Sequence, residues 1–148
     1  MWKLLPVCLL VGCAATGQQQ PNQARIVRQI DLPLEPSTRS ADDQPSKRAF
    51  QGTRIQGWLD ETGAWHIRTE VEHGRLRCGT YEVGIRLGRG NPVCSSVEWL
   101  TGVDYATKLL HCNNAARPHV GDSKIYDMAN RFEEVTCVRV VVRCEGTC

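Results

Sequence analysis

The stretch Trp65-His-Ile-Arg-Thr-Glu-Val-Glu72 decides the expected fold, because its side chains alternate in character without a break. Trp65, Ile67, Thr69 and Val71 would share one face of an extended chain, with charged or polar side chains on the other face. A period of two predicts a β-strand with one face in the core and the other toward solvent.

Two further stretches alternate in the same way. Residues 81–87 bring four apolar side chains to one face, and residues 135–144 alternate apolar side chains with Arg139 and Arg143. With few candidate helices, these strands predict a mainly β domain. We expect a small, disulfide-stabilised antiparallel sandwich or barrel-like domain.

The segments between these strands are less regular. The phase of alternation changes between Cys78 and Tyr81, which predicts a β-bulge at Gly79 and Thr80. A loop is expected over 88–92 and a further strand over 94–100. Residues 104–114 fit either a helix or a strand, and we favour a strand.

One short helix is expected near residues 124–134. Asp122 or Ser123 could cap its start, and its apolar side chains recur at helical spacing. These apolar residues are Ile125, Met128, Ala129 and Phe132.

The N-terminus combines a cation at Lys3, an apolar run over 4–11 and small residues before Cys13. This layout is typical of an export signal. Leu10-Val-Gly-Cys13 resembles the lipobox of bacterial lipoproteins. The resemblance covers only residues 1–13, and a plain signal peptide cleaved nearby is the alternative.

The lipobox resemblance implies that residues 1–12 are removed and that Cys13 becomes a lipidated N-terminus. Several acyl chains on one residue would make membrane attachment effectively permanent. Ala14, in place of an aspartate, implies transfer to an outer membrane. The expected location is therefore the cell envelope, lipid-anchored in the outer membrane and facing the periplasm or the cell surface.

The chain has eight cysteines. One would leave with the signal and one would carry lipid, so 8 − 2 = 6 remain in the exported chain. An even number in an oxidising compartment predicts three disulfides rather than a metal site, and no C-x₂-C pair is present. Cys78 and Cys94 could pair across the turn, whereas opposite parity argues against a Cys137–Cys144 bond. The six candidates are Cys78, Cys94, Cys112, Cys137, Cys144 and Cys148.

Composition divides the mature chain into a tether and a head. Residues 13–50 are rich in Gln, Pro and Ser, which predicts a flexible tether, and residues 51–148 would form the folded head. An apolar island over 24–34 could be a first strand packed on the head, or a segment that docks on a partner. Its apolar residues are Ile26, Val27, Ile30, Leu32 and Leu34.

We found no catalytic constellation in the sequence. No Gly-x-Ser-x-Gly motif or nucleotide-binding loop is present. The expected positions are the solvent face for His66, turns for His73 and His119, and the interior for His111. The aromatic residues Trp58, Trp65, Trp99 and Tyr81 could line a sugar-stacking platform, but the last three fall on core phases.

Arginines are the most frequent charged residues on the predicted outward faces. Arg68, Arg86, Arg139 and Arg143 could together form a patch for an anionic partner, or belong to an ordinary mixed-charge surface. The formal net charge of +2 does not favour nucleic-acid binding.

We therefore expect an envelope lipoprotein that is not an enzyme and carries neither cofactor nor metal. It would serve as a binding or scaffolding module for another envelope protein, while its lipid holds it to the membrane. One alternative is a periplasmic inhibitor of an exogenous hydrolase such as lysozyme. A second alternative is a protein that binds or modifies cell-wall glycan.

Overall fold

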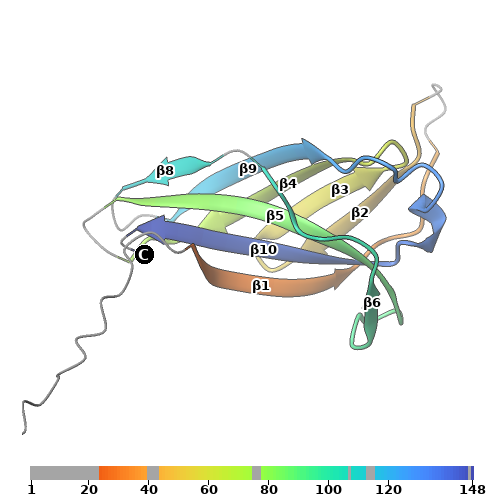
Figure 1. Ribbon diagram of the computed structural model, residues 1–148, viewed down its shortest axis with the longest axis horizontal. Helices are drawn as coiled ribbons and strands as arrows, with labels where there is room; N and C mark the ends of the chain where they lie inside the picture. Colours follow the sequence, from red (N-terminus) through yellow and green to blue (C-terminus); the bar gives the residue numbers. More distant parts are fainter. Residues whose placement is uncertain (1–23, 40–43, 75–77, 107, 113–115, 147) are drawn as a thin grey trace, which may run out of the picture.

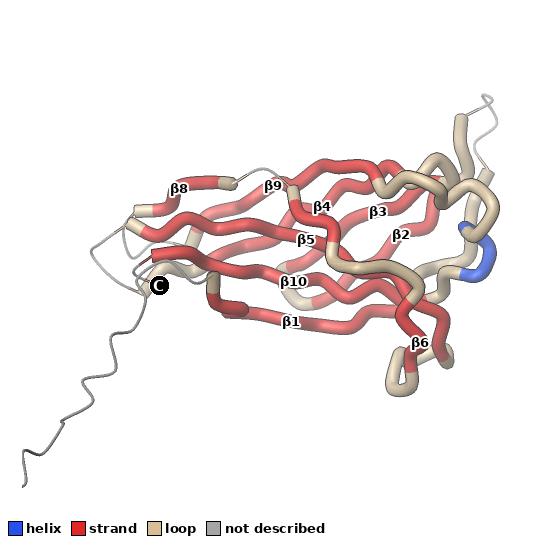
Figure 2. Tube along the Cα trace, viewed as in Figure 1, coloured by secondary structure: helices blue, strands red, loops and turns tan. Residues whose placement is uncertain are grey.

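The computed structural model describes residues 24–39, 44–74, 78–106, 108–112, 116–146 and 148. Two antiparallel sheets face each other across one core, as the ribbon in Figure 1 and the tube in Figure 2 show. Neither sheet closes into a barrel within this described part. The fold is therefore the sandwich of the two expected arrangements.

The first sheet is built around two long central strands. Its order is β1 (Arg25–Pro33), β10 (Cys137–Gly146), β5 (Gly79–Gly90) and β6 (Val97–Trp99). Two more short strands, β7 (Asp104–Tyr105) and β8 (Leu109–His111), also pair with β5. Three short segments thus share one long partner along its length.

The second sheet has four strands. Its order is β2 (Lys47–Gly52), β3 (Ile55–Asp60), β4 (Ala64–Val71) and β9 (Arg117–Lys124). Their alternate side chains point into the sandwich, so the interior is filled from both sheets. The buried apolar side chains include Phe50, Leu59, Trp65, Ile67, Tyr81, Val83, Ile85, Leu87, Val138, Val140 and Val142.

The three alternating stretches are confirmed as β4, β5 and β10. Between them the details differ from the predictions. No bulge forms at Gly79 and Thr80, which pair in register with Gly146 and Glu145, because the strand itself begins at Gly79. β5 also continues through Gly90, so the loop expected over 88–92 starts later.

The helix expected near 124–134 is much shorter than predicted. Only a 3₁₀ turn, η1 (Phe132–Glu134), forms, and Asp122 and Ser123 belong to β9. Asp127 adopts a φ of 69°, which an α-helix does not accept. Met128 and Phe132 reach the core from turns, so the apolar spacing reflects burial rather than a helical period.

The strands begin within the region where composition predicted a tether. Residues 25–33 pair with β10, and residues 47–52 form the edge of the second sheet. Of the two interpretations of the apolar island, the structure has the strand packed on the protein's own domain. The low mean hydropathy of this region predicted a tether, but its apolar side chains at alternate positions are sufficient to bury Leu32 and Leu34.

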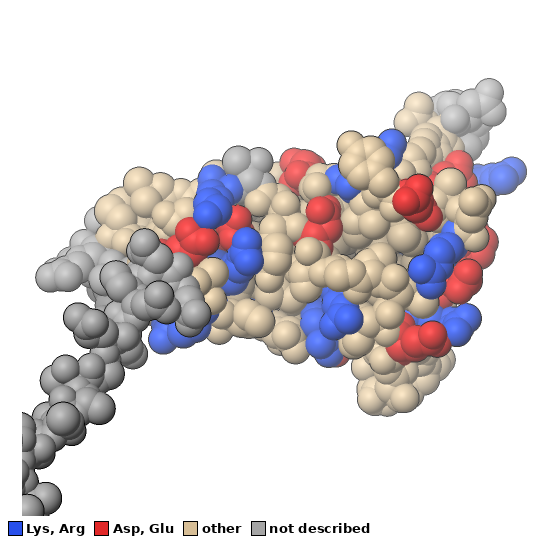
Figure 3. Space-filling model, in the orientation of Figure 1, with Lys and Arg blue, Asp and Glu red and all other residues tan. Residues whose placement is uncertain are grey.

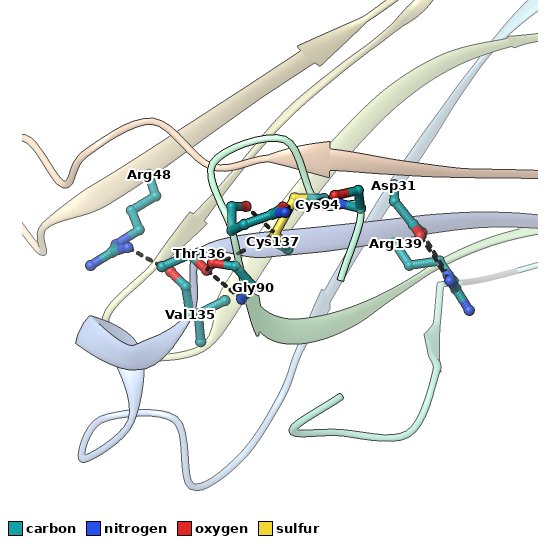
Figure 4. Close-up of a disulfide and its surroundings, with 10 residues drawn as sticks. Asp31, Arg48, Gly90, Cys94, Val135, Thr136, Cys137 and Arg139 are labelled. Carbon is teal, nitrogen blue, oxygen red and sulfur yellow. Dashed lines mark hydrogen bonds and ion pairs between the residues drawn. A yellow bond between two sulfur atoms is a disulfide. The ribbon is translucent and has the colours of Figure 1, made fainter. Parts of the chain in front are cut away.

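Three disulfides join the six predicted cysteines, as Cys78–Cys112, Cys94–Cys137 and Cys144–Cys148. Cys137 and Cys144 have different partners, as their parity predicted. The Cys78–Cys94 pairing is wrong, because Cys94 lies in the turn that faces the start of β10 (Figure 4). Nearness in sequence did not reflect nearness across the sheet.

Candidate functional site

The outer face of the second sheet carries two rows of side chains that cross all four strands. The register aligns Ala49, Trp58, His66 and Asp122 in the first row. It aligns Gln51, Gln56, Arg68 and Val120 in the second row. Directly opposed side chains on neighbouring strands are within contact distance, so each row forms a continuous strip of surface.

Trp58 is the central side chain of the first row. Its ring is stacked on His66, with centroids 5.9 Å apart and planes inclined by 13°. The His66 Nδ1 in turn lies 2.5 Å from Asp122 Oδ1. The Nζ of Lys47 lies 4.3 Å from the Trp58 ring centroid, which is a cation–π contact. Trp58 is thus held in one orientation while part of its surface stays open to solvent.

The segment just before β2 builds a wall beside this strip. The Glu35 N–H donates to the Ala49 carbonyl oxygen at 2.8 Å, and Thr38 and Lys47 exchange two backbone hydrogen bonds. These bonds cover part of the outer edge of β2. They also hold Glu35 beside the sheet face.

A groove of about 390 Å³ lies between this wall and Trp58. A volume of this size is in the range of small-molecule sites, which is about 300–1,000 Å³. The small side chain of Ala49 leaves the space open. The groove is lined by Glu35, Ala49, Phe50, Gln51, Gln56, Gly57, Trp58 and His66.

Gly57 allows β3 to pack closely against the Phe50 ring beneath it. A Cβ atom there would lie 2.3 Å from the His66 carbonyl oxygen and 2.4 Å from Phe50 Cζ. Only glycine lets the Phe50 ring pack directly beneath the strand. The aromatic ring below therefore supports the groove that contains Trp58.

The chemistry of the groove favours binding. One indole supplies an apolar wall, and two primary amides and a carboxylate supply donors and acceptors at its rim. The His66–Asp122 pair orients an imidazole, but the groove lining contains no serine, threonine or cysteine that could act as a nucleophile.

The predicted arginine patch is divided between the two sheets. Arg68 lies on the second sheet, whereas Arg86, Arg139 and Arg143 lie on the outer face of the first. Charged side chains of both signs lie next to one another on the molecular face in Figure 3. Three of the four residues thus share a surface, and Arg68 belongs to another.

The arginines of the first sheet are engaged within the protein. Arg139 donates two hydrogen bonds to Asp31, at 2.6 and 2.8 Å, as Figure 4 shows in part. This bond and the carboxylate charge raise the pKa of Arg139 above its usual value. Arg143 pairs with Glu82 and lies 3.7 Å from the Tyr105 ring centroid. These partners neutralise much of the patch.

The five apolar residues of the island over 24–34 are divided in the same way. Ile30, Leu32 and Leu34 pack on the protein's own core. Ile26 and Val27 stay exposed, at 55% and 41%. Only these two of the five candidates are free on the surface of the strand.

A buried polar cluster lies between β5, β8 and β9. His73 Nδ1 is 2.7 Å from the Tyr81 hydroxyl, and His111 Nδ1 is 3.2 Å from His119 Nε2. His111 is buried as predicted, but His73 and His119 are buried too, and His119 is in a strand. Burial raises the pKa of Tyr81 and lowers that of His119. These groups bridge strands within the core.

Among the described side chains, no group of three or more His, Cys, Asp or Glu could hold a metal ion. The helical part of the same residues contains no segment of the length and apolarity needed to span a bilayer. Cys13 and the whole predicted signal lie outside the described residues.

The four aromatic residues that could line a sugar-stacking platform lie apart in the structure. Trp65 and Tyr81 are in the core, and Trp99 lies over Arg139 on the first sheet. Trp58 alone lines the groove. The sequence indicated only that His66 lies on an outward face, and the register of the structure makes it the cross-strand neighbour of Trp58.

The fold and the site define a disulfide-stabilised antiparallel β-sandwich with an aromatic groove on one outer sheet face. Comparisons with protein-family models, with curated proteins and with solved structures give no match.

Proposed function

We propose that this protein is a non-catalytic binding module of a bacterial cell envelope. Lipid on Cys13 would hold it to the membrane, and the sandwich would hold a second envelope component. The observation that supports this proposal is the groove beside Trp58, which combines an oriented aromatic wall with a polar rim.

The binding surface differs from the one that the sequence suggested. The sequence predicts that a partner meets the apolar island or the arginines. Leu32 and Leu34 instead pack in the core, and Arg139 and Arg143 are paired with carboxylates. We therefore place the ligand in the groove.

Retention on the envelope tests this proposal. Envelopes from producing cells are extracted with mild detergent, and the fraction of protein that stays with the insoluble material is measured. We expect retention of the unaltered chain and at least a fivefold loss for Trp58→Ala. Tyr126→Ser is the matched control, since it removes an exposed aromatic side chain outside the groove.

Two results would contradict the proposal. Release of the unaltered chain by detergent alone would mean that it holds no insoluble envelope component. Equal retention of the unaltered chain and the Trp58→Ala variant would mean that the groove is not the binding surface.

A further inference from the structure

We infer that the ligand of the groove is an uncharged saccharide built of pyranose rings. The inference rests on the proposed binding function and names its ligand class. It is carried by three features of the groove, which are its aromatic wall, its polar rim and its charge.

The aromatic wall suits the face of a sugar ring. The face of an indole carries negative potential, which attracts the weakly positive C–H groups on one side of a pyranose. The Trp58 ring is fixed by His66 on the neighbouring strand, so little side-chain freedom remains to be lost on binding. On the β2 side, the Lys47 ammonium lies over this ring, and its long side chain can move aside.

The rim suits hydroxyl and acetamido groups. Gln51 and Gln56 are exposed and lie opposite each other on neighbouring strands. Each primary amide offers two donor hydrogens and one acceptor oxygen, so the pair can serve groups that both donate and accept. Glu35 adds a carboxylate acceptor at the wall.

Charged side chains of both signs surround the site. Glu35 lines the groove and Lys47 lies over the Trp58 ring, so both charge signs are present on the β2 side, and the His66 ring lies against Asp122. A strongly anionic polymer would meet the carboxylates of Glu35 and Asp122 here, whereas an uncharged ligand meets no like charge. The backbone bonds of Glu35 and Thr38 to β2 also cover the edge where an extended peptide would add a strand.

Calorimetric titration of the purified full-length chain in detergent micelles tests the inference. The probes are a tetrasaccharide of N-acetylglucosamine and the glucose tetrasaccharide maltotetraose. We expect saturable binding of at least one probe. Trp58→Ala should weaken it at least tenfold, Trp58→Phe at most about threefold because the aromatic face remains, and Tyr126→Ser should leave it unchanged.

Each variant is first checked for an unchanged thermal unfolding midpoint, and Gln56→Ala serves as a second probe of the rim if Trp58→Ala does not fold. No binding of either sugar would overturn the saccharide inference. Binding that is unaffected by Trp58→Phe, Trp58→Ala and Gln56→Ala alike would overturn the groove as its place. If the sugars fail while envelope retention still depends on Trp58, the ligand class is wrong and the binding function stands.

Discussion

A methyl group at position 57 would collide with the His66 carbonyl oxygen and with the Phe50 ring. One of these two neighbours is backbone and cannot move without disturbing the pairing of β3 with β4. We expect Gly57→Ala to lower the free energy of unfolding by about 1–3 kcal/mol, as is usual for overpacking.

Chemical denaturation at equilibrium measures this change. Gly102→Ala is the control, since a Cβ there would meet nothing within 4 Å. Equal stability of the two variants would show that the space beneath Gly57 is larger than the structure indicates.

Protonation of His119 links stability to pH. Its pKa lies below the ordinary value of 6.5, mainly because the ring is buried, and also because His111 and Arg117 are near. The unfolded chain therefore binds a proton at a higher pH than the folded chain does. The resulting contribution to stability is complete above about pH 6.5 and is lost as the pH falls below that value.

We expect the free energy of unfolding to fall between pH 7.5 and 5.5, and to fall less in His119→Gln. Denaturation curves across this range measure how steeply the free energy of unfolding changes with pH in each of the two proteins. Parallel slopes in the two proteins would mean that His119 does not carry the effect. The comparison uses slopes because the substitution itself changes packing at the site.

Among the strands, β1 forms by pairing with β10 although the composition of its region predicted a flexible tether. Leu32 faces the core at 7% exposure, while Ile26 on the same strand is 55% exposed. Leu32→Ala should cost about 2–5 kcal/mol, and Ile26→Ala less than about 0.5 kcal/mol. Thermal or chemical unfolding of the two variants measures the difference. Small, equal effects would indicate that β1 contributes little to the domain.

The strands that alternate over seven or more residues could be predicted from sequence, as β4, β5 and β10 show. The shorter strands could not, since β7 and β8 have two and three residues and exist because β5 supplies hydrogen-bonding partners. The expected helix is shorter for a related reason. Core contacts of Met128 and Phe132 repeat at helical spacing although the chain between them turns at Asp127.

The same limit applies to the candidate site. Outward positions of single strands were predictable, including that of His66. The row that joins it to Trp58 and Asp122 depends on the register of three strands. A strand pattern contains no information about which neighbour will lie opposite, so the groove could not be located in advance.

For the whole molecule, the disulfides differ in the length of chain that they close. Cys78–Cys112 and Cys94–Cys137 span 34 and 43 residues, and Cys144–Cys148 spans 4. The chain-entropy model predicts losses of about 4 kcal/mol for either long bridge and about 2 kcal/mol for the short one. Paired Cys→Ala variants, unfolded without reductant, measure this order. A greater loss from the short bridge would contradict it.

The anchor can be tested independently of the fold. Cys13→Ser should move the protein from the detergent phase to the aqueous phase in a temperature-induced detergent separation, because lipid is no longer attached. Cys8→Ser is the matched control, since residue 8 lies within the predicted signal. Detergent-phase partitioning of Cys13→Ser would rule out lipid on Cys13 as the anchor.

The sequence by itself determined that the chain is mainly β, with six of its eight cysteines in three disulfides, because alternation and cysteine number are local or countable properties. Only the tertiary structure decided which cysteines form disulfides, which arginines pair with carboxylates, and which of the four candidate aromatic residues lines the groove. Each of these depends on pairing between segments far apart in the chain. That pairing follows from burying both inner sheet faces at once, and no single stretch of sequence specifies it.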